Sequence, residues 1–177
     1  MIQIKHWATG AVLFEHAGDG LRAAVETAVA DGGSLDGASL DGANLIRASL
    51  NGASLDGASL DGASLDDASL NGASLNGASL NGASLNGASL DGARGIIDAG
   101  QRTDGYRFLG VLGPDGHLMI KAGCRWFIAS RARAHWGGSD YPDRALGDES
   151  LARVALIVTL ARARGWRVER DASGETA

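Results

Sequence analysis

The hydrophobic residues in the middle third of the chain recur at every fifth position. Twelve leucines run from Leu35 to Leu90 at this spacing, and an alanine stands two residues before eleven of them. In an α-helix five residues advance the chain by about 500°, so successive leucines would spread around the cylinder. In a flat strand an odd spacing places successive leucines on opposite faces. The period therefore predicts a chain that turns a corner in every five-residue unit.

Each unit reads Ala-Ser-Leu-Asp/Asn-Gly, and its other positions support the same interpretation. Leu and Ala lie two residues apart, so on an extended segment both point to one side and line an interior, while Ser and Asp/Asn point outward. The fifth residue is Gly in ten of the twelve units, which suits a tight corner with positive φ. Low-complexity Gly/Ser sequence is also typical of flexible linkers, but a linker has no reason to keep a leucine at every fifth position.

This repeat resembles the pentapeptide-repeat family, whose pattern is Ala-(Asp/Asn/Ser)-Leu-x-x. The likeness covers residues 33–92 without a break. The resemblance implies a right-handed quadrilateral β-helix with four pentapeptides in each coil, so the units make about three coils. Coils stacked about 4.8 Å apart then give a regular rod about 15 Å tall. The overall layout is similar to that of capped pentapeptide-repeat proteins of bacteria and phages.

A coil of twenty residues predicts which outward side chains stand above one another. Two columns begin with acids, Asp36 with Asp56 and Asp41 with Asp61, and each continues with an asparagine. Stacked asparagines can form hydrogen-bonded ladders, whereas stacked exposed carboxylates repel one another modestly. We therefore expect the acidic side of the rod to lie in its N-terminal coils.

The departures from the repeat fall on one predicted face. Arg47 and Asp67 are the non-glycine corner residues, and because they are twenty residues apart we expect a surface ion pair of at most about 1 kcal/mol. Ile46 is the one apolar residue in an outward Asp/Asn position, and Asn44 is the one residue before a repeat leucine that is not Ser. Drift in a tolerant solenoid is one interpretation. The other is a contact face for a partner, made of Asn44, Ile46, Arg47, Asp66 and Asp67.

Residues 1–32 predict a cap for the first coil, because a β-helix exposes unpaired backbone edges at its ends. Strand-like segments at 2–7 and 11–14 flank a turn and indicate a hairpin. Asp19 suits the N-cap of a helix that follows. The apolar stripe of this helix is Leu21, Ala24, Val25 and Ala28.

After the repeat, which we place at 33–97, the pattern predicts a linker at 98–105, a small α/β domain at 106–169 and a disordered tail at 170–177. Strands are expected at 106–112, 117–121 and 124–127, and the first two are joined by the turn signal Gly-Pro-Asp-Gly. Ser130 suits the cap of a short helix that ends at Trp136. The longest helix is expected to start at Asp148 and to end at Gly165, after which Trp166 folds back.

A domain of about 65 residues has a marginal core, so we expect it to dock on the last coil or on a second copy of itself, giving a homodimer. Arg125, Trp126 and Trp136 are the candidates for such an interface, because tryptophan and arginine are enriched in interface hot spots. The alternative is that the tryptophans fill the small core.

The composition of this 177-residue chain indicates where the protein is located and which partners it can bind. Its single cysteine, Cys124, cannot form an intrachain disulfide, and no apolar run resembles a signal peptide or a membrane span. We therefore expect a cytoplasmic protein that does not contact the membrane. The repeat carries a net charge of −6 and residues 93–177 carry +3. An acidic rod repels nucleic acid, so direct nucleic-acid binding by the repeat is not expected.

No motif indicates catalysis or a cofactor. The repeat contains no histidine that would activate its serines, and Cys124, His117 and His135 do not follow a metal-ligand spacing. We therefore expect a protein that is not an enzyme and holds no cofactor or metal. Its expected function is that of a scaffold, presenting a rigid acidic face to a protein of unknown identity.

The family resemblance adds one alternative, a DNA mimic that acts on DNA gyrase or topoisomerase. Three coils are short for that role, and asparagine replaces some of the aspartates in the outward columns. Such proteins also often place Phe where this chain has Leu. A dimer formed end to end would lengthen the rod.

Overall fold

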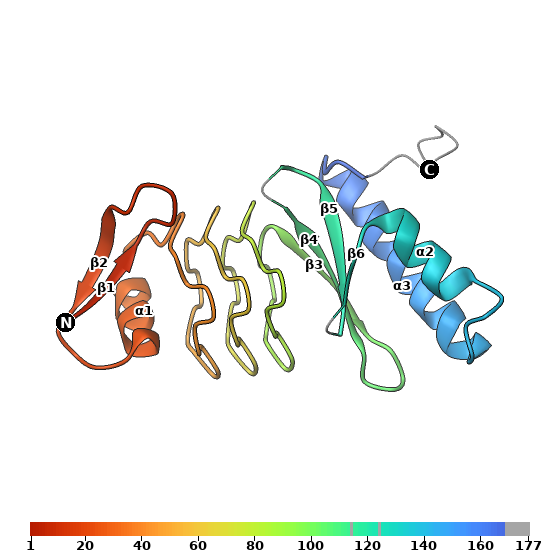
Figure 1. The fold of residues 1–177 in the computed structure, drawn as a ribbon, viewed down its shortest axis with the longest axis horizontal. Coiled ribbons are helices and arrows are strands. Elements are labelled where there is room, and N and C mark those ends of the chain that lie inside the picture. Colours follow the sequence, from red (N-terminus) through yellow and green to blue (C-terminus); the bar gives the residue numbers. More distant parts are fainter. Residues whose placement is uncertain (114, 124, 169–177) are drawn as a thin grey trace. The chain divides into compact units, whose positions relative to one another are not determined.

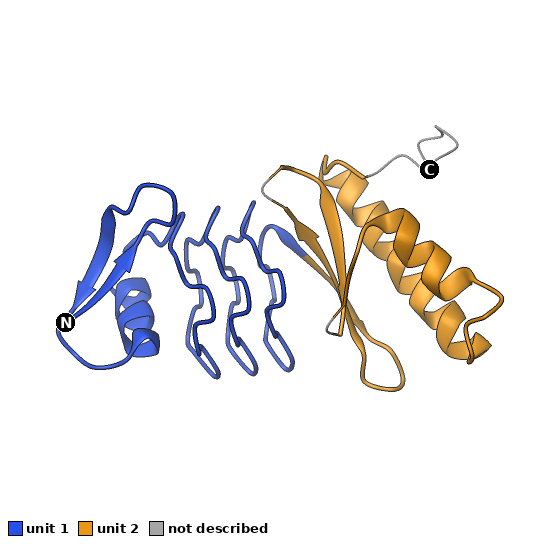
Figure 2. Cartoon of the chain, in the orientation of Figure 1, with its two compact units in different colours: residues 1–96 blue, residues 97–177 orange. Residues whose placement is uncertain are grey.

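The computed structural model describes residues 1–113, 115–123 and 125–168, and the chain divides into two compact units. Unit 1 comprises residues 1–96 and unit 2 comprises residues 97–177 (Figure 2). Unit 1 holds the repeat together with the elements that precede it. Unit 2 contains a sheet and two helices. Cys124 and the expected tail at 170–177 lie outside the described residues.

The repeat of unit 1 forms a solenoid in which neighbouring coils pair at residues twenty positions apart. Parallel bridges join Ser39 to Ser59 and Ser59 to Ser79, and the same step recurs around the coil. Between neighbouring coils, the N–H of Leu40 donates to the carbonyl of Ser59 at 2.8 Å, and the N–H of Ser59 donates to the carbonyl of Ala38 at 2.8 Å. Four pentapeptides therefore separate each residue from its neighbour in the next coil (Figure 1).

Leucine and alanine fill the interior of this solenoid, as the five-residue period predicts. The repeat leucines are almost fully buried, from 0% exposure at Leu35 to 8% at Leu90. Each unit closes with a turn such as that from Leu40 to Ala43, whose N–H and carbonyl are 3.1 Å apart. The third residue of the turn has positive φ, 64° at Gly42, which explains the preference for glycine there.

A hairpin and a helix cover the first coil (Figure 1). Strand β1 (Ile2–Lys5) pairs antiparallel with β2 (Val12–His16), and helix α1 spans Leu21–Ala30. The segment after β1 pairs with the coil edge, because the N–H of Ser39 donates to Lys5 at 2.7 Å and that of Trp7 donates to Gly37 at 2.8 Å. These bonds satisfy backbone groups that the open coil would leave unpaired.

The predicted helix cap at Asp19 is wrong. The residue at the N-cap of α1 is Gly20, with φ of 98°, and no side chain caps the helix there. Glycine adopts this left-handed conformation without steric cost, so the chain enters the helix one residue later than expected. The buried stripe of α1 consists of Ala24, Val25 and Ala28, while Leu21 is half-buried.

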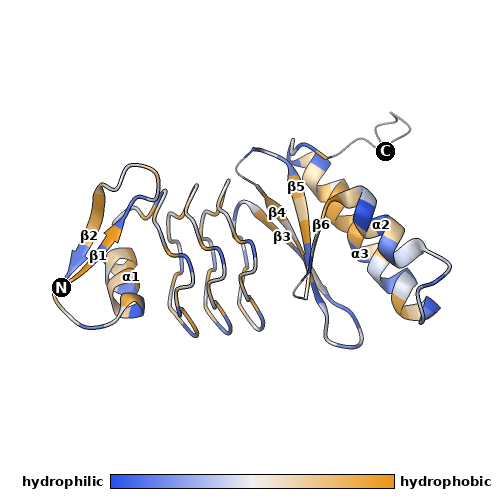
Figure 3. Cartoon of the chain, in the orientation of Figure 1, coloured by the Kyte–Doolittle hydropathy of each residue, from blue (hydrophilic) through white to orange (hydrophobic). Residues whose placement is uncertain are grey.

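Unit 2 is a four-stranded sheet with the order β3-β4-β5-β6 and two helices, α2 and α3 (Figure 1). The strands are β3 (Ile96–Gln101), β4 (Arg107–Leu112), β5 (Leu118–Ala122) and β6 (Arg125–Phe127). The helices, α2 (Ala129–Gly137) and α3 (Arg144–Ala163), pack on one face of the sheet, and apolar residues concentrate on these strands and on α3 (Figure 3). Gly110 allows close packing here, since a Cβ at that position would lie 2.6 Å from Cγ2 of Ile157.

Three expectations for this part of the chain differ from the structure. The linker expected at 98–105 is strand up to Gln101, because Ile97 and Ala99 alternate with polar residues and face the core. Helix α3 starts at Arg144, not at Asp148, since the side chain of Asp143 caps it by accepting from the N–H of Leu146 at 3.0 Å. Ser130 is not a cap, because α2 begins at Ala129 with Ile128 at the N-cap.

Among the described residues, no helix combines the length and the apolar character needed to span a bilayer.

We expect Leu60→Ala to lower the free energy of unfolding by about 2–5 kcal/mol, because Leu60 is fully buried and truncation leaves a cavity. Urea denaturation followed by far-UV circular dichroism measures the loss. Asp19→Ala serves as the control and should change the free energy by less than about 0.5 kcal/mol, since Asp19 is exposed and makes no cap. A similar loss in both variants would contradict the assigned interior.

Candidate functional site

The outward Asp and Asn side chains of the solenoid form a hydrogen-bonded ladder between coils. Oδ1 of Asp36 accepts from the hydroxyl of Ser54 at 2.7 Å and from the N–H of Asp56 at 3.0 Å. The same pair of bonds recurs at seven positions, namely Asp36, Asp41, Asn51, Asp56, Asp61, Asp66 and Asn71. The structure stacks the predicted acidic columns, and in them one oxygen of each of these carboxylates binds the next coil.

Asp56 shows how the ladder accommodates a buried part of a charged side chain. Partial burial acts to raise the pKa of this carboxyl. The hydrogen bonds from Ser74 and from Asn76, together with the positive charge of Arg94, outweigh burial and lower the pKa of Asp56 below its ordinary 3.8. Asp56 is therefore an ionised side chain that also joins two coils.

Ile46 interrupts this ladder. Its side chain offers no acceptor to Ser64, the residue that occupies the donor position of the next coil. The backbone of Ile46 is instead bound from two sides, since its N–H donates to Oδ1 of Asn44 at 3.3 Å and its carbonyl accepts from Nη1 of Arg22 at 3.0 Å. Arg22 also lies 3.9 Å from Glu26 on α1. Helix α1 thus reaches the face that carries the departures from the repeat.

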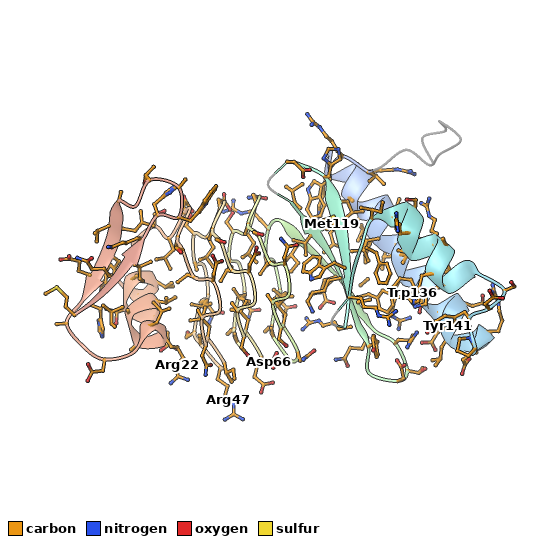
Figure 4. The ribbon with its side chains drawn as sticks, viewed as in Figure 1. Arg22, Arg47, Asp66, Met119, Trp136 and Tyr141 are labelled. Atoms are coloured by element: carbon orange, nitrogen blue, oxygen red, sulfur yellow. The ribbon has the colours of Figure 1, made fainter. Side chains whose placement is uncertain are left out.

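The corner beside Ile46 carries two residues with unfavourable backbone angles. Arg47 and Asp67 have φ of 59° and 58°, and they are the non-glycine residues with positive φ among the described part of the chain. Their side chains form an exposed ion pair, with Nε of Arg47 3.8 Å from Oδ2 of Asp67. The carboxylate of Asp67 lies over Gly87, where a Cβ would approach Oδ1 to 2.2 Å. Arg22, Arg47 and Asp66 lie along the same edge of unit 1 (Figure 4).

Unit 2 contains a cleft of about 530 Å³, lined by residues from three separate segments. These are the β3–β4 loop with Arg102 and Tyr106, the end of β5 and start of β6 with Ala122 and Arg125, and residues 134–142, which include Trp136. Arg125 is exposed, in agreement with an interface role, but Trp136 is only 4% exposed and packs against Phe108 and Phe127 in the core. The expectation that Trp136 forms an interface is therefore wrong, because the small core needs its ring.

Trp126 lies apart from this cleft. On β6 it alternates with Arg125 and Phe127, and Phe127 packs against the core beneath the helices. Trp126 therefore points to the opposite face of the sheet, and its Nε1 has no hydrogen-bond partner among the described residues. The structure does not bring the three expected interface residues together at one surface.

A buried arginine organises one wall of the cleft, and sequence reasoning did not find it. Arg102 is 6% exposed, and its guanidinium binds Asp104, the hydroxyl of Tyr141 at 2.9 Å and Oγ of Ser150 at 3.0 Å. The hydrogen bond to Asp104 outweighs the effect of burial and raises the pKa of Arg102, and the same contact lowers the pKa of Asp104. The short spacing Arg-Thr-Asp-Gly-Tyr in a predicted linker was the available signal, since arginine and aspartate two residues apart can pair.

The described residues contain no group of three or more His, Cys, Asp or Glu side chains that would hold a metal ion.

The comparisons with known proteins agree with the geometry of the solenoid. A family model described as pentapeptide repeats matches residues 29–62 and 58–94. Residues 29–94 are a pentapeptide-repeat segment. The repeats of this family form β-helical solenoids, and the twenty-residue pairing of unit 1 is in accord with that fold. No curated protein matches the chain.

We expect Asp56→Asn to reduce the loss of stability at acid pH. Because folding lowers the pKa of Asp56, the ionised carboxylate contributes stability that is present above about pH 4 and is lost as the pH falls through the lower, folded pKa. The amide oxygen keeps the ladder acceptor but does not titrate. Urea midpoints at pH 7 and pH 3 should differ less for the variant than for the wild type.

Asp31→Asn is the matched control, because it removes the same charge from the turn after α1, outside the ladder. Its midpoints should follow those of the wild type. An equal effect of both substitutions would show that general charge, and not the ladder, causes the acid sensitivity.

Proposed function

We propose that the protein is a non-catalytic scaffold whose acidic solenoid binds a partner protein, with the contact centred on Ile46 and Arg47. The observation that carries the proposal is that two adjacent residues lack features that stabilise the other units. Ile46 lacks the side-chain acceptor of the ladder, and Arg47 replaces the corner glycine. The pentapeptide-repeat segment is in accord with a non-enzymatic interaction protein.

The first departure removes a hydrogen-bonded acceptor. At seven other positions, the residue after leucine accepts from a serine and from a backbone N–H of the next coil. Ile46 makes neither bond with its side chain and leaves part of an apolar side chain in contact with water. Each such hydrogen bond contributes about 0.5–1.5 kcal/mol to folding.

The second departure places a side chain on a left-handed backbone. The conformation of Arg47 costs about 1–2 kcal/mol relative to glycine. The ion pair with Asp67 offsets little of this, since Arg47 and Asp67 have side chains 78% and 59% exposed and pairs of this kind contribute at most about 1 kcal/mol. Binding of a partner would account for two such costs at neighbouring residues.

The chemistry of this face suits a protein partner. Ile46 supplies an apolar centre, Arg22 and Arg47 supply cations, and Asp66 and Asp67 supply anions beside it. Protein interfaces combine an apolar core with a polar rim, and arginine is enriched among residues that dominate binding. Asn44 holds the loop by its bond to the N–H of Ile46.

For the solenoid itself we propose a right-handed quadrilateral β-helix of about three coils, on the support of the twenty-residue pairing and four turns per coil. Its stacked bonds make the face rigid, so little entropy is lost when a partner binds.

The single cysteine supports a cytoplasmic location, and the repeat supports a bacterial or phage origin. A homodimer formed through unit 2 belongs to the same proposal.

The DNA-mimic alternative rests on the acidic columns, where Asp56 keeps a lowered pKa and hence its charge. It has less support, because one oxygen of each ladder carboxylate is bound to the next coil and asparagines replace the acids further along. Inhibition of DNA supercoiling by purified gyrase tests it directly.

We expect the double variant Ile46→Asn with Arg47→Gly to lose its partner while it keeps or gains stability. The substitutions restore a ladder acceptor and relieve the backbone at the corner, so the melting temperature should stay equal or rise by a few degrees. Affinity capture from bacterial lysate, with wild type and variant as baits and mass spectrometry as the readout, measures the binding.

Asp41→Asn is the control bait, because it changes the charge of a neighbouring face and keeps a ladder acceptor. Proteins held by the wild type and the control but not by the double variant would support the proposed face. If all baits retain the same proteins, the face is wrong. If Asp41→Asn alone loses gyrase, the acidic columns carry the interaction.

A further inference from the structure

We propose that the cleft of unit 2 binds a small organic ligand in which one anionic group is attached to a planar ring, with the anion on Arg125. The cleft forms where the β3–β4 loop, the start of β6 and the α2–α3 connection meet. Its volume of about 530 Å³ lies within the range of about 300–1,000 Å³ that small-molecule sites occupy. This site is separate from the scaffold function proposed for the solenoid.

Arg125 supplies the anion-binding group. Four other arginines of this unit, Arg102, Arg107, Arg144 and Arg153, have a carboxylate partner at 4 Å or less. Arg125 lines the cleft and is exposed, and its side chain forms no hydrogen bond or ion pair with a described residue. A guanidinium binds a carboxylate or phosphate through two parallel N–H groups, so a free arginine in a concave site favours such a ligand.

The charge of the other lining residues limits the ligand to one anionic group. Arg102 contributes little net charge, because Asp104 binds its guanidinium. Asp140 also lines the cleft, and among the described residues its carboxylate accepts from the neighbouring hydroxyl of Ser139 alone, at 3.1 Å. A polyanion would be repelled by Asp140, whereas a single carboxylate or phosphate can reach Arg125.

Aromatic side chains supply the surface for a ring. Tyr106 is 44% exposed, and Tyr141 and His135 lie with their ring centroids 5.7 Å apart in an edge arrangement. Trp136 and Tyr141 both lie on the helical side of the unit, near the α2–α3 connection (Figure 4). Aromatic groups bind planar ligands by stacking or edge contacts, which provides the apolar part of the recognition.

The walls are held in place before a ligand binds. The hydrogen bonds of Arg102 join the β3–β4 loop to Tyr141 and to Ser150 on α3. The guanidinium also lies 5.0 Å from the centre of the Tyr106 ring, and Gly123 lies so close that a Cβ there would be 2.5 Å from Cε1 of that ring. A pre-positioned site binds with less loss of conformational freedom, so a small ligand suffices.

The experiment titrates the full chain with defined probes and follows amide and indole N–H signals by NMR, with calorimetry for the affinity. Benzoate is compared with benzamide, which keeps the ring without the charge, and with acetate, which keeps the charge without the ring. Adenosine monophosphate is compared with adenosine in the same way. Saturable binding of benzoate points to aromatic carboxylates, and saturable binding of the nucleotide points to a phosphate ligand.

We expect Arg125→Ala to weaken binding of the favoured anion by about tenfold or more, because one charged contact is lost. Arg131→Ala is the matched control, since Arg131 is also exposed but does not line the cleft. It should leave the affinity unchanged. Arg125 is exposed, so its substitution leaves the fold intact, and the spectrum of the free variant checks this.

Three results would overturn the proposal. The first is no saturable binding of benzoate or the nucleotide up to about 10 mM. The second is equal binding of the charged and neutral members of each pair, or of acetate and benzoate. The third is unchanged affinity in Arg125→Ala.

Discussion

The burial of one leucine in every five residues is the constraint on which unit 1 depends. A leucine that faces inward at this period forces a corner between successive units, and the corner in turn brings each residue beside the residue twenty positions later. Backbone pairing between coils then follows, and it aligns the outward serines with the carboxylates and amides of the preceding coil. The surface ladder is therefore a consequence of the interior.

The period made the solenoid predictable, because it is a property of the sequence that no regular helix or strand explains. The stacking of Arg47 on Asp67 followed from the same register. The ladder itself did not follow, since columns of carboxylates were expected to repel one another. The sequence shows which residues stack, but it does not show that Oδ1 of each side chain reaches the serine and the N–H of the next coil.

Prediction was weaker in unit 2, where no repeat fixes the register. The strands and the long helix were predicted, but the boundaries depended on capping residues that have several alternatives nearby, such as Asp143 and Asp148. The cleft was not visible at all. Arg102 is 39 residues from Tyr141 and 48 from Ser150 in the sequence, and only the packing of two helices on the sheet brings them together. Trp136 was a candidate for the interface because tryptophan is common in interfaces, but its packing places it in the core.

The pairing of residues twenty positions apart also restricts how such a protein can change in length. Insertion or deletion of four whole pentapeptides preserves every column, whereas one, two or three pentapeptides rotate one part of the solenoid against the other by one, two or three faces. Such a rotation would separate Arg47 from Asp67 and move Ile46 away from the residues beside it. Duplication of a coding segment therefore keeps such columns in register only when it adds complete coils. A surface built from residues of several coils is kept by these duplications and is disrupted by shorter ones within it.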